Sequence, residues 1–301
     1  MLSLLIPIYA YDVRPLVEEL RRQCDIVGLD YEIICFDDAS PEHYQKLNRD
    51  LAGLPHITYR EMPQNLGRSA IRNCLAEAAQ YEYLLFMDCD SGVVRDDYIR
   101  RYAVALQPDK LLYGGRVYAA TPPAETDYYL HWLYGSKREQ MPANIRQHNP
   151  YHAFMTNNFL IPRAIFLQIR FDERLRQYGH EDTLFGRQLE KRGVPIIHFD
   201  NPLEHLGLES APVFLDKSAR AIDNLAMLLE AGEPIVTRLT IFYNWLKNKK
   251  LAGVVAKLGA PLLPLMRRQL MGRNPSLTLF DAMKLVILCR SMTNDQLISK
   301  L

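Results

Sequence analysis

Two carboxylates that follow a short apolar run are the residues of this chain best suited to chemistry. The run covers residues 83–87, and Asp88 and Asp90 come directly after it. Such a run is typical of a buried strand, and open α/β sheets bind ligands beyond the carboxyl ends of their strands. Because Mg²⁺ and Mn²⁺ prefer carboxylate oxygens and share them with substrate phosphates, the pair predicts a site for a divalent cation and a diphosphate. A solvated acidic turn is the alternative for an isolated pair of this kind.

A second acidic cluster follows another apolar run, residues 31–36. Asp38 is placed to accept hydrogen bonds from the N–H groups of a nucleobase, and Ser40 to cap the turn or helix that follows. The alternative, in which Asp37, Asp38 and Ser40 serve only as caps for that helix, stays open.

A glycine and two arginines mark the start of a further predicted helix. Gly67 permits a tight entry into the helix, whose first N–H groups suit an anion. Arg68 and Arg72 are four residues apart and therefore lie on one helical face. We expect them to pair with phosphate or with the acidic strand ends, although two surface arginines on an amphipathic helix would give the same pattern.

Residues for acid–base chemistry and a further metal ligand come later in the chain. Asp182 is a candidate general base for an acceptor hydroxyl, and Glu181 a candidate for binding or orienting that acceptor. An acidic pair at this position also complements a helix dipole, which is the structural alternative. His205 follows another predicted strand, where a neutral imidazole can complete a metal site or simply pack against its neighbours.

The elements that position these groups alternate between strand-like and helix-like patterns. Strands are predicted over residues 2–8, 31–36, 57–61, 83–87, 158–161 and 196–199. Helices are predicted over residues 13–24, 42–51, 68–79, 97–106 and 183–192. This alternation predicts an α/β fold with a mostly parallel sheet flanked by helices. The first strand is not followed by Gly-x-Gly-x-x-Gly, which disfavours a Rossmann dinucleotide fold.

Two segments depart from this alternation. Residues 121–151 are rich in Pro, Tyr, His and Asn without clear periodicity, which is typical of a functional or disordered loop. After residue 207 the pattern is helical to the end, so the sheet is followed by a helical C-terminal region.

Charge is unevenly distributed along the 301 residues. The formal net charge is +1, but residues 241–301 hold ten Lys/Arg and two Asp, a net charge of +8, and the remaining 240 residues carry −7. The five cysteines show no Cys-x-x-Cys spacing, which indicates a reducing compartment. Without a basic leader or an apolar run of roughly 18 residues, the sequence predicts a cytoplasmic or peripheral protein.

In their order and spacing, the motifs of residues 1–210 resemble glycosyltransferase family 2, whose members are inverting, nucleotide-sugar-dependent enzymes with the GT-A fold. The matching motifs are Pro7-x-Tyr9, Asp37-Asp38-x-Ser40, Asn65-x-Gly67-x-x-x-x-Arg72-Asn73, Asp88-x-Asp90, Glu181-Asp182 and His205. There are three departures. Ala10 stands where the family usually has Asn, Ala39 where it often has Gly, and Ser91 where it commonly has a further Asp.

The resemblance implies how the donor nucleotide would be bound. Pro7, Tyr9 and Asp38 would line the base pocket, with Asp38 at the family's uracil-binding position. Arg68 would lie near the nucleotide and Asp88 beside the ribose.

The resemblance also implies a metal ion and a catalytic base. Asp90 would hold Mn²⁺ or Mg²⁺, with Asp88 beside it and His205 as an accessory ligand. Asp182 would be the general base, with Glu181 next to it.

The implied activity is transfer of a sugar from a nucleotide-diphospho-sugar, with UDP favoured because of Asp38, to a hydroxyl of a glycan or lipid-linked sugar. The resemblance also implies that the reaction would serve the synthesis of cell-surface polysaccharide or glycolipid. Residues 1–210 would form the catalytic domain, with a nucleotide-sugar half over about 1–115 and an acceptor half over about 116–210, and residues 211–301 would be a helical, basic extension. A non-catalytic nucleotide-sugar-binding protein is one alternative. A sugar nucleotidylyltransferase is another, although it would need a Gly-rich basic loop where this chain has residues 7–11.

The C-terminal region predicts contact with a membrane surface. Trp245 precedes Lys247, Lys249 and Lys250, and an apolar stretch over 251–266 is followed by two arginines. Apolar and aromatic residues with basic flanks are typical of an interfacial helix, which would place the protein at the inner face of the membrane. The alternative is that these helices pack on the catalytic domain. Nucleic acid is not an expected partner, because the body of the chain is acidic.

Overall fold

The computed structural model describes residues 1–174 and 179–298, with side chains through residue 293. These residues form two compact units. The first unit contains residues 1–119, 136–174 and 181–207, and the second contains residues 120–135, 179–180 and 208–298.

A seven-stranded sheet forms the centre of the first unit. Its strands are β1 (Leu2–Ile8), β2 (Tyr31–Asp37), β3 (Ile57–Glu61), β4 (Tyr83–Met87), β6 (Leu111–Tyr113), β8 (Asn158–Pro162) and β9 (Ile196–His198). They are ordered β3-β2-β1-β4-β8-β6-β9. All neighbouring pairs are parallel except the two that involve β8, which is antiparallel to both β4 and β6. The prediction of a mostly parallel sheet is confirmed.

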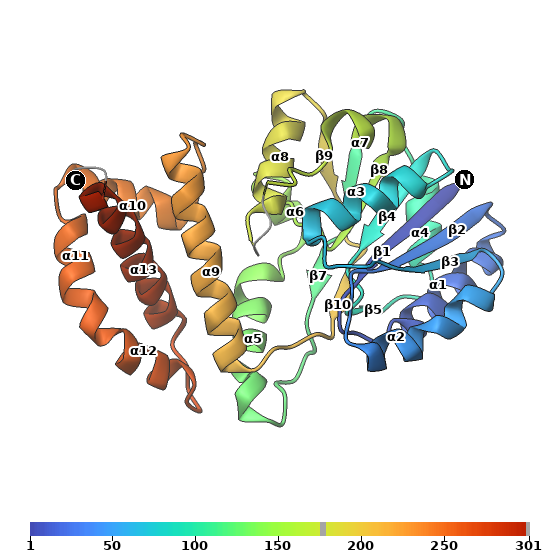
Figure 1. Cartoon of the computed structure of the whole chain (residues 1–301). Coiled ribbons are helices and arrows are strands. Elements are labelled where there is room, and N and C mark those ends of the chain that lie inside the picture. The colour runs from blue at the N-terminus through green and yellow to red at the C-terminus, as the bar shows by residue number, and fades with distance from the viewer. Residues whose placement is uncertain (175–178, 299–301) are drawn as a thin grey trace. The chain divides into compact units, whose positions relative to one another are not determined.

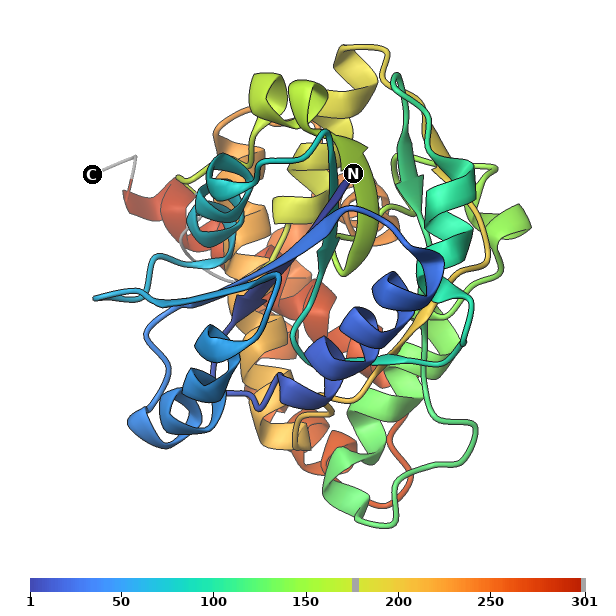
Figure 2. The same cartoon turned by 90° about the vertical axis from the view of Figure 1, so that its right-hand side faces the viewer.

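Helices cover both faces of this sheet. They are α1 (Arg14–Val27), α2 (Glu42–Asn48), α3 (Arg68–Ala78), α4 (Tyr98–Ala105), α6 (Ala143–Arg146), α7 (Arg163–Ile169) and α8 (Glu181–Lys191). Because strand side chains alternate between faces, Leu4 and Ile6 of β1 pack into the core on the side of α1 and α4, whereas Leu5 packs on the side of α3, α7 and α8. In Figure 2, α1 (dark blue) and α3 (cyan) lie on either side of the blue strands.

Asn158, the first residue of β8, connects several parts of this unit. Its Oδ1 accepts hydrogen bonds from the hydroxyls of Tyr98 (2.8 Å) and Tyr102 (2.7 Å), and its Nδ2 donates to the carbonyls of Gly115 and Asn201 (both 2.9 Å). A buried amide with all these partners links α4 to the loops that follow β6 and β9, and so fixes the edge of the sheet where the motifs lie.

A small second sheet lies beside the carboxyl end of β4. It consists of β5 (Ser91–Val93), β10 (Leu203–His205) and β7 (Arg116–Val117), in the order β5-β10-β7. In the antiparallel pairing of β10 with β5, His205 lies opposite Ser91. Strands of two or three residues are too short to show a periodic pattern, so the sequence did not predict these three.

The segment 121–151 is more regular than predicted. It contains η2 (Thr126–Tyr128), α5 (Tyr129–Tyr134), the π-helical turn η3 (Gly135–Glu139) and α6. Each is under two full helical turns, which is too short to give a helical pattern in the sequence. Leu130 of α5 is buried with Phe214 and Phe280 in the core of the second unit.

The second unit is a bundle of helices, which confirms the predicted helical C-terminal region. It contains α5, α9 (Ala211–Glu230), α10 (Arg238–Asn248), α11 (Ala252–Gly259), η4 (Ala260–Leu262), α12 (Leu263–Leu270) and α13 (Leu277–Ile298). Helices α9 to α12 pack around α13, which buries Phe280, Met283 and Cys289 among others (Figure 1). In the described part of the chain, no helix is both long and apolar enough to cross a membrane.

Candidate active site

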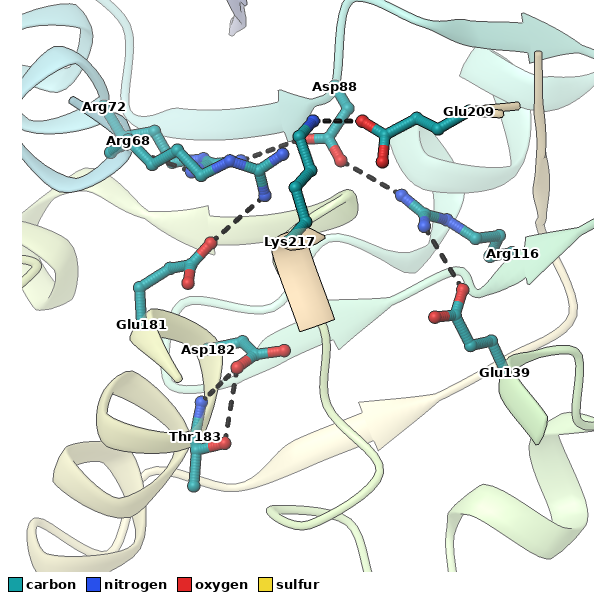
Figure 3. Close-up of polar contacts among 10 residues, drawn as sticks. All are labelled: Arg68, Arg72, Asp88, Arg116, Glu139, Glu181, Asp182, Thr183, Glu209 and Lys217. Atoms are coloured by element: carbon teal, nitrogen blue, oxygen red, sulfur yellow. Dashed lines mark hydrogen bonds and ion pairs between the residues drawn. The ribbon is translucent and has the colours of Figure 1, made fainter. Parts of the chain in front are cut away.

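Asp88, at the carboxyl end of β4, lies between two arginines (Figure 3). Its Oδ1 accepts a hydrogen bond from Arg72 Nη2 of α3 at 2.7 Å, and its Oδ2 accepts one from Arg116 Nη2 of β7 at 3.0 Å. The Arg72 side chain is only 2 % exposed, so the Asp88 carboxylate compensates a guanidinium that is removed from water. Both carboxylate oxygens are therefore engaged within the protein, and the places predicted for Asp88 beside a ribose and a metal ion stay predictions.

Asp90 has a different environment. Its Oδ2 lies 3.6 Å from His205 Nδ1, and its buried Oδ1 accepts no hydrogen bond from any described residue. Burial pushes the pKa of Asp90 up, but His205 and then Arg116 outweigh burial and hold that pKa well below its usual range. A side chain at Gly207 would collide with the Asp90 carboxylate, since a Cβ there would lie 2.2 Å from Oδ2. Asp90 is therefore a partly buried, ionised carboxylate whose Oδ1 accepts no hydrogen bond within the described structure.

The Asp90–His205 pair suits a divalent cation. Carboxylate oxygen and imidazole nitrogen are both ligands of Mn²⁺, and oxygen is preferred by Mg²⁺. No cluster of three or more His, Cys, Asp or Glu side chains with metal-binding geometry occurs among the described residues. Two protein ligands would leave most coordination positions for water and the oxygens of a substrate, which is the usual arrangement for Mg²⁺ at phosphates.

Arg116, Glu139 and Tyr118 belong to this cluster although the sequence did not indicate them. Arg116 Nη1 lies 3.3 Å from Glu139 Oε2, which also accepts a short hydrogen bond from the Tyr118 hydroxyl. The Tyr118 ring packs edge-on against His205, with centroids 5.4 Å apart. The available signal was the position of Arg116 directly after two glycines at the end of the apolar run 111–113.

The two carboxyl groups at the start of α8 have different surroundings and pKa values shifted in opposite directions. Glu181 Oε1 lies 3.3 Å from Arg68 Nη1. Burial opposes ionisation of Glu181, but Arg68 and Arg72 together lower its pKa. Burial and then the charge of Glu181 raise the pKa of Asp182 to about 6, against the hydrogen bond that its Oδ1 accepts from the Thr183 N–H at 2.7 Å. Carboxyl groups whose pKa values differ can take different roles, one as a charged group and the other as a proton acceptor. Asp182 is the candidate proton acceptor of this pair.

Arg68 and Arg72 connect the two acidic groups into one cluster. Arg72 Nη1 donates to the Arg68 carbonyl at 3.2 Å. The Arg68 side chain reaches Glu181, and the Arg72 side chain reaches Asp88. The prediction that these arginines pair with the acidic strand ends is therefore correct for Arg72, and Arg68 pairs with the acidic start of α8.

Asp38 is engaged by the turn that enters α3. Its Oδ1 accepts the N–H of Leu66 at 2.6 Å and its Oδ2 accepts the N–H of Gly67 at 3.0 Å, while burial raises its pKa. The expected capping of α2 is not made, because the N-terminus of this helix has no side-chain cap. Asp37 Oδ1 instead accepts the Ser40 N–H at 2.7 Å in the preceding turn, and Ser40 Oγ accepts the Ala10 N–H at 2.9 Å. Asp38 thus shapes the loop beside the predicted base pocket. Its direct contact with a base stays a prediction.

Pro7 and Tyr9 lie at the carboxyl end of β1, next to these loops. Pro7 is half-buried within the strand, and Tyr9 is exposed just beyond it. The neighbouring Ala10 and Ala39 adopt φ values of 52° and 57°. These left-handed conformations favour Gly and Asn and cost Ala about 1 kcal/mol each, which explains physically why the family often has Asn and Gly there.

We predict that Asp88→Asn destabilises the protein by about 3 kcal/mol, because it leaves the buried Arg72 guanidinium without its counter-charge. Asp90→Asn should cost less, because Asp90 Oδ1 makes no hydrogen bond in the described structure. Urea unfolding of both variants measures the difference. Asp97→Asn, which removes a surface ion pair to Arg95, is the control and should leave stability unchanged. Equal stability of Asp88→Asn and the unsubstituted protein would contradict the structural role of Asp88.

Comparisons with known proteins agree with this fold and these motifs. Chondroitin synthase of Escherichia coli is 27% identical over an alignment of 198 residues, and the match covers 54% of this chain but only 28% of that protein. Among solved structures, S. aureus TarS 1–349 in complex with UDP-GlcNAc superimposes with a TM-score of 0.53 at 14% identity, over 99% of this chain and 92% of that one. The mannosyltransferase PcManGT from Pyrobaculum calidifontis in complex with GDP-Man and Mn²⁺ gives a TM-score of 0.54 at 13% identity, over 98% and 87% of the two chains.

At these identities the two structures show a shared fold. The family model for glycosyl transferase family 2 matches residues 3–170, which include Asp38, Arg68, Asp88 and Asp90. The match covers more than half of the chain and confirms the resemblance that the motifs predicted. The chain therefore belongs to glycosyl transferase family 2.

Proposed function

We propose that this glycosyltransferase moves a sugar, with inversion at the anomeric carbon, from a nucleotide-diphospho-sugar to an acceptor hydroxyl. The observation that carries the proposal is that the two neighbouring carboxyl groups at the start of α8 have pKa values shifted in opposite directions. Asp182 has its pKa raised to about 6 by burial and by the charge of Glu181, while arginines keep the neighbouring Glu181 charged. A base with such a pKa is largely ionised at neutral pH and binds a proton more readily than an ordinary carboxylate.

In the proposed reaction, Asp182 removes the proton of the acceptor hydroxyl as its oxygen attacks the anomeric carbon. The new carbon–oxygen bond forms on the face opposite the nucleotide, and the bond to the diphosphate breaks with its electron pair going to the diphosphate. Positive charge develops on the sugar, as in other glycosyl transfers. Glu181 would bind or orient the acceptor, with Arg68 holding its carboxylate in place.

The leaving diphosphate gains negative charge, which the site can compensate. Asp90 and His205 would hold Mn²⁺ or Mg²⁺, and a bound ion supplies positive charge to the diphosphate so that no acid is needed on that side. The similar mannosyltransferase fold that holds GDP-Man with Mn²⁺ supports this assignment. Asp88 would lie beside the ribose with its two arginines close to the donor.

For the donor and the acceptor, we propose chemical classes and not individual compounds. UDP-sugars are favoured by the position of Asp38 at the uracil-binding motif, and a similar structure holds UDP-GlcNAc. Pro7 and Tyr9 would line the base pocket. The similarity to a chondroitin synthase supports a glycan or lipid-linked sugar as acceptor, in polysaccharide or glycolipid synthesis in the cytoplasm.

We predict that Mn²⁺ strengthens UDP binding at least about tenfold, and that Asp90→Ala or His205→Ala removes most of this gain. Isothermal calorimetry with and without EDTA measures it independently of turnover. Asp96→Ala, at an exposed carboxylate six residues further along, is the matched control. If UDP binding is indifferent both to EDTA and to Asp90→Ala, the metal assignment is wrong.

Asp182→Asn should lower turnover by about a hundredfold or more, because an amide cannot take up the proton of the acceptor hydroxyl. UDP affinity should stay unchanged, which separates loss of the base from loss of the donor site. The assay uses UDP-sugars with a panel of glycan acceptors. A variant with near-normal turnover would move the base elsewhere, with Glu181 the first candidate.

The pH profile should have an acidic limb near pH 6, because Asp182 works only when ionised. Turnover is expected to be full above this pH and to fall about tenfold per unit below it. Glu181→Gln removes the charge that helps to raise the Asp182 pKa, so its limb should move to lower pH whatever its effect on the maximal rate. A limb that stays in place in Glu181→Gln would contradict the coupling of the two carboxyl groups.

A further inference from the structure

Exposed apolar side chains are concentrated in one part of the second unit. Among the described residues, ten of the twenty exposed large apolar side chains lie between residues 236 and 271. Isolated exposed apolar residues are normal on a protein surface, but a concentration of this kind marks an interaction site.

The helical run from α11 through η4 to α12 has a clear inner and outer side. Its inner side faces α13, where Gly259 packs so closely on Val286 that a Cβ at 259 would lie 2.5 Å from the valine side chain. The outer side carries four exposed apolar residues at spacings of four, four and three, which places them along one face. These residues are Val254, Leu258, Leu262 and Leu265.

Helix α10 also has a buried side and an exposed apolar side. Tyr243 and Leu246 are buried, whereas Ile241, Phe242 and Trp245 are about half exposed. The rings of Phe242 and Trp245 stack at the surface, with centroids 5.5 Å apart and an interplanar angle of 15°. Aromatic rings in this position provide rigid apolar area with little entropy left to lose on binding.

The charge on these helices has a single sign. Residues 234–280 contain eight Lys/Arg and no Asp or Glu. Lys247, Lys249, Lys250 and Lys257 are all exposed beside the apolar residues, while Arg267 pairs with Asp216 at 2.8 Å. This surface combines apolar side chains with positive charge. It is therefore complementary to a surface that combines hydrocarbon with negative charge.

We propose that the outer faces of α10, α11, η4 and α12 bind an anionic lipid surface. These helices surround α13 (Figure 1), so their outer residues reach lipid without unfolding of the bundle. Leucines and a Trp–Phe pair insert at the boundary between headgroups and acyl chains, and the lysines contact anionic headgroups. Nucleic acid would match the charge but leave the leucines in water. The binding is peripheral and reversible, and it weakens with salt.

The test uses Trp245 as a reporter. The chain has two tryptophans, so Trp132→Phe leaves Trp245 as the single emitter. The protein is mixed with vesicles of phosphatidylcholine alone or of equimolar phosphatidylcholine and phosphatidylglycerol. Expected are a blue shift of Trp245 emission, quenching by brominated acyl chains and co-sedimentation, all confined to the anionic vesicles and reversed by high salt.

Substitutions separate the apolar from the charged contribution. Leu258→Ser with Leu265→Ser should weaken vesicle binding about tenfold or more, because both side chains then lose hydrocarbon contact. Lys247→Gln with Lys249→Gln and Lys250→Gln should remove the preference for anionic vesicles. The matched control is Ile26→Ser with Val104→Ser, at residues that are 69% and 79% exposed on α1 and α4. Thermal melts confirm that each variant folds.

Several results would overturn the proposal. They are equal binding to neutral and anionic vesicles, an unchanged Trp245 emission, and an equal loss of binding in the control variant. Concentration-dependent self-association without lipid, abolished by Leu258→Ser and Leu265→Ser, would instead assign this face to a second copy of the chain.

Discussion

The carboxylate of Asp88, held between Arg72 and Arg116, is the contact on which the arrangement of the site depends. It joins the end of the central strand β4 to α3 on one side and to β7 on the other. Arg116 extends the contact to Glu139. Because Arg72 is buried, its charge must be matched, and Asp88 supplies the match where the sheet opens toward the site.

The pKa values of the remaining acidic groups depend on the charged groups around them. Asp90 lies next to His205 and near the positive charge of Arg116, so its pKa stays low although it is partly buried. Asp182 has a carboxylate rather than a cation as its neighbour, so its pKa rises. Carboxyl groups of nearly the same chemistry thereby become a counter-ion, a candidate metal ligand and a candidate base, through their surroundings alone.

The second unit follows a different constraint. Helix α13 is apolar on several sides and is covered by α9 to α12, which must therefore each turn one apolar face inward. Helices α10 to α12 nevertheless keep apolar residues on their outer faces as well. Burial of α13 does not require those residues, and this is what sets the outer surface apart from ordinary helix packing.

The sequence by itself determined the elements with strong local patterns. Strands β1, β3 and β4 begin and end as predicted. For β1 and β4 the reason is a continuous apolar run, which identifies a buried strand. The position of Asp88 and Asp90 beyond β4, and of Glu181 and Asp182 at the start of α8, follows from the same patterns.

Tertiary structure alone decided which partners these groups have. Arg116 is 28 residues from Asp88, and the Leu66 N–H that engages Asp38 is likewise 28 residues away. Nothing in a local pattern encodes such pairings, nor the antiparallel direction of β8 that brings Asn158 between two tyrosines. They arise because folding brings distant strand ends to one edge of the sheet, where each buried charge must find the nearest group able to compensate it.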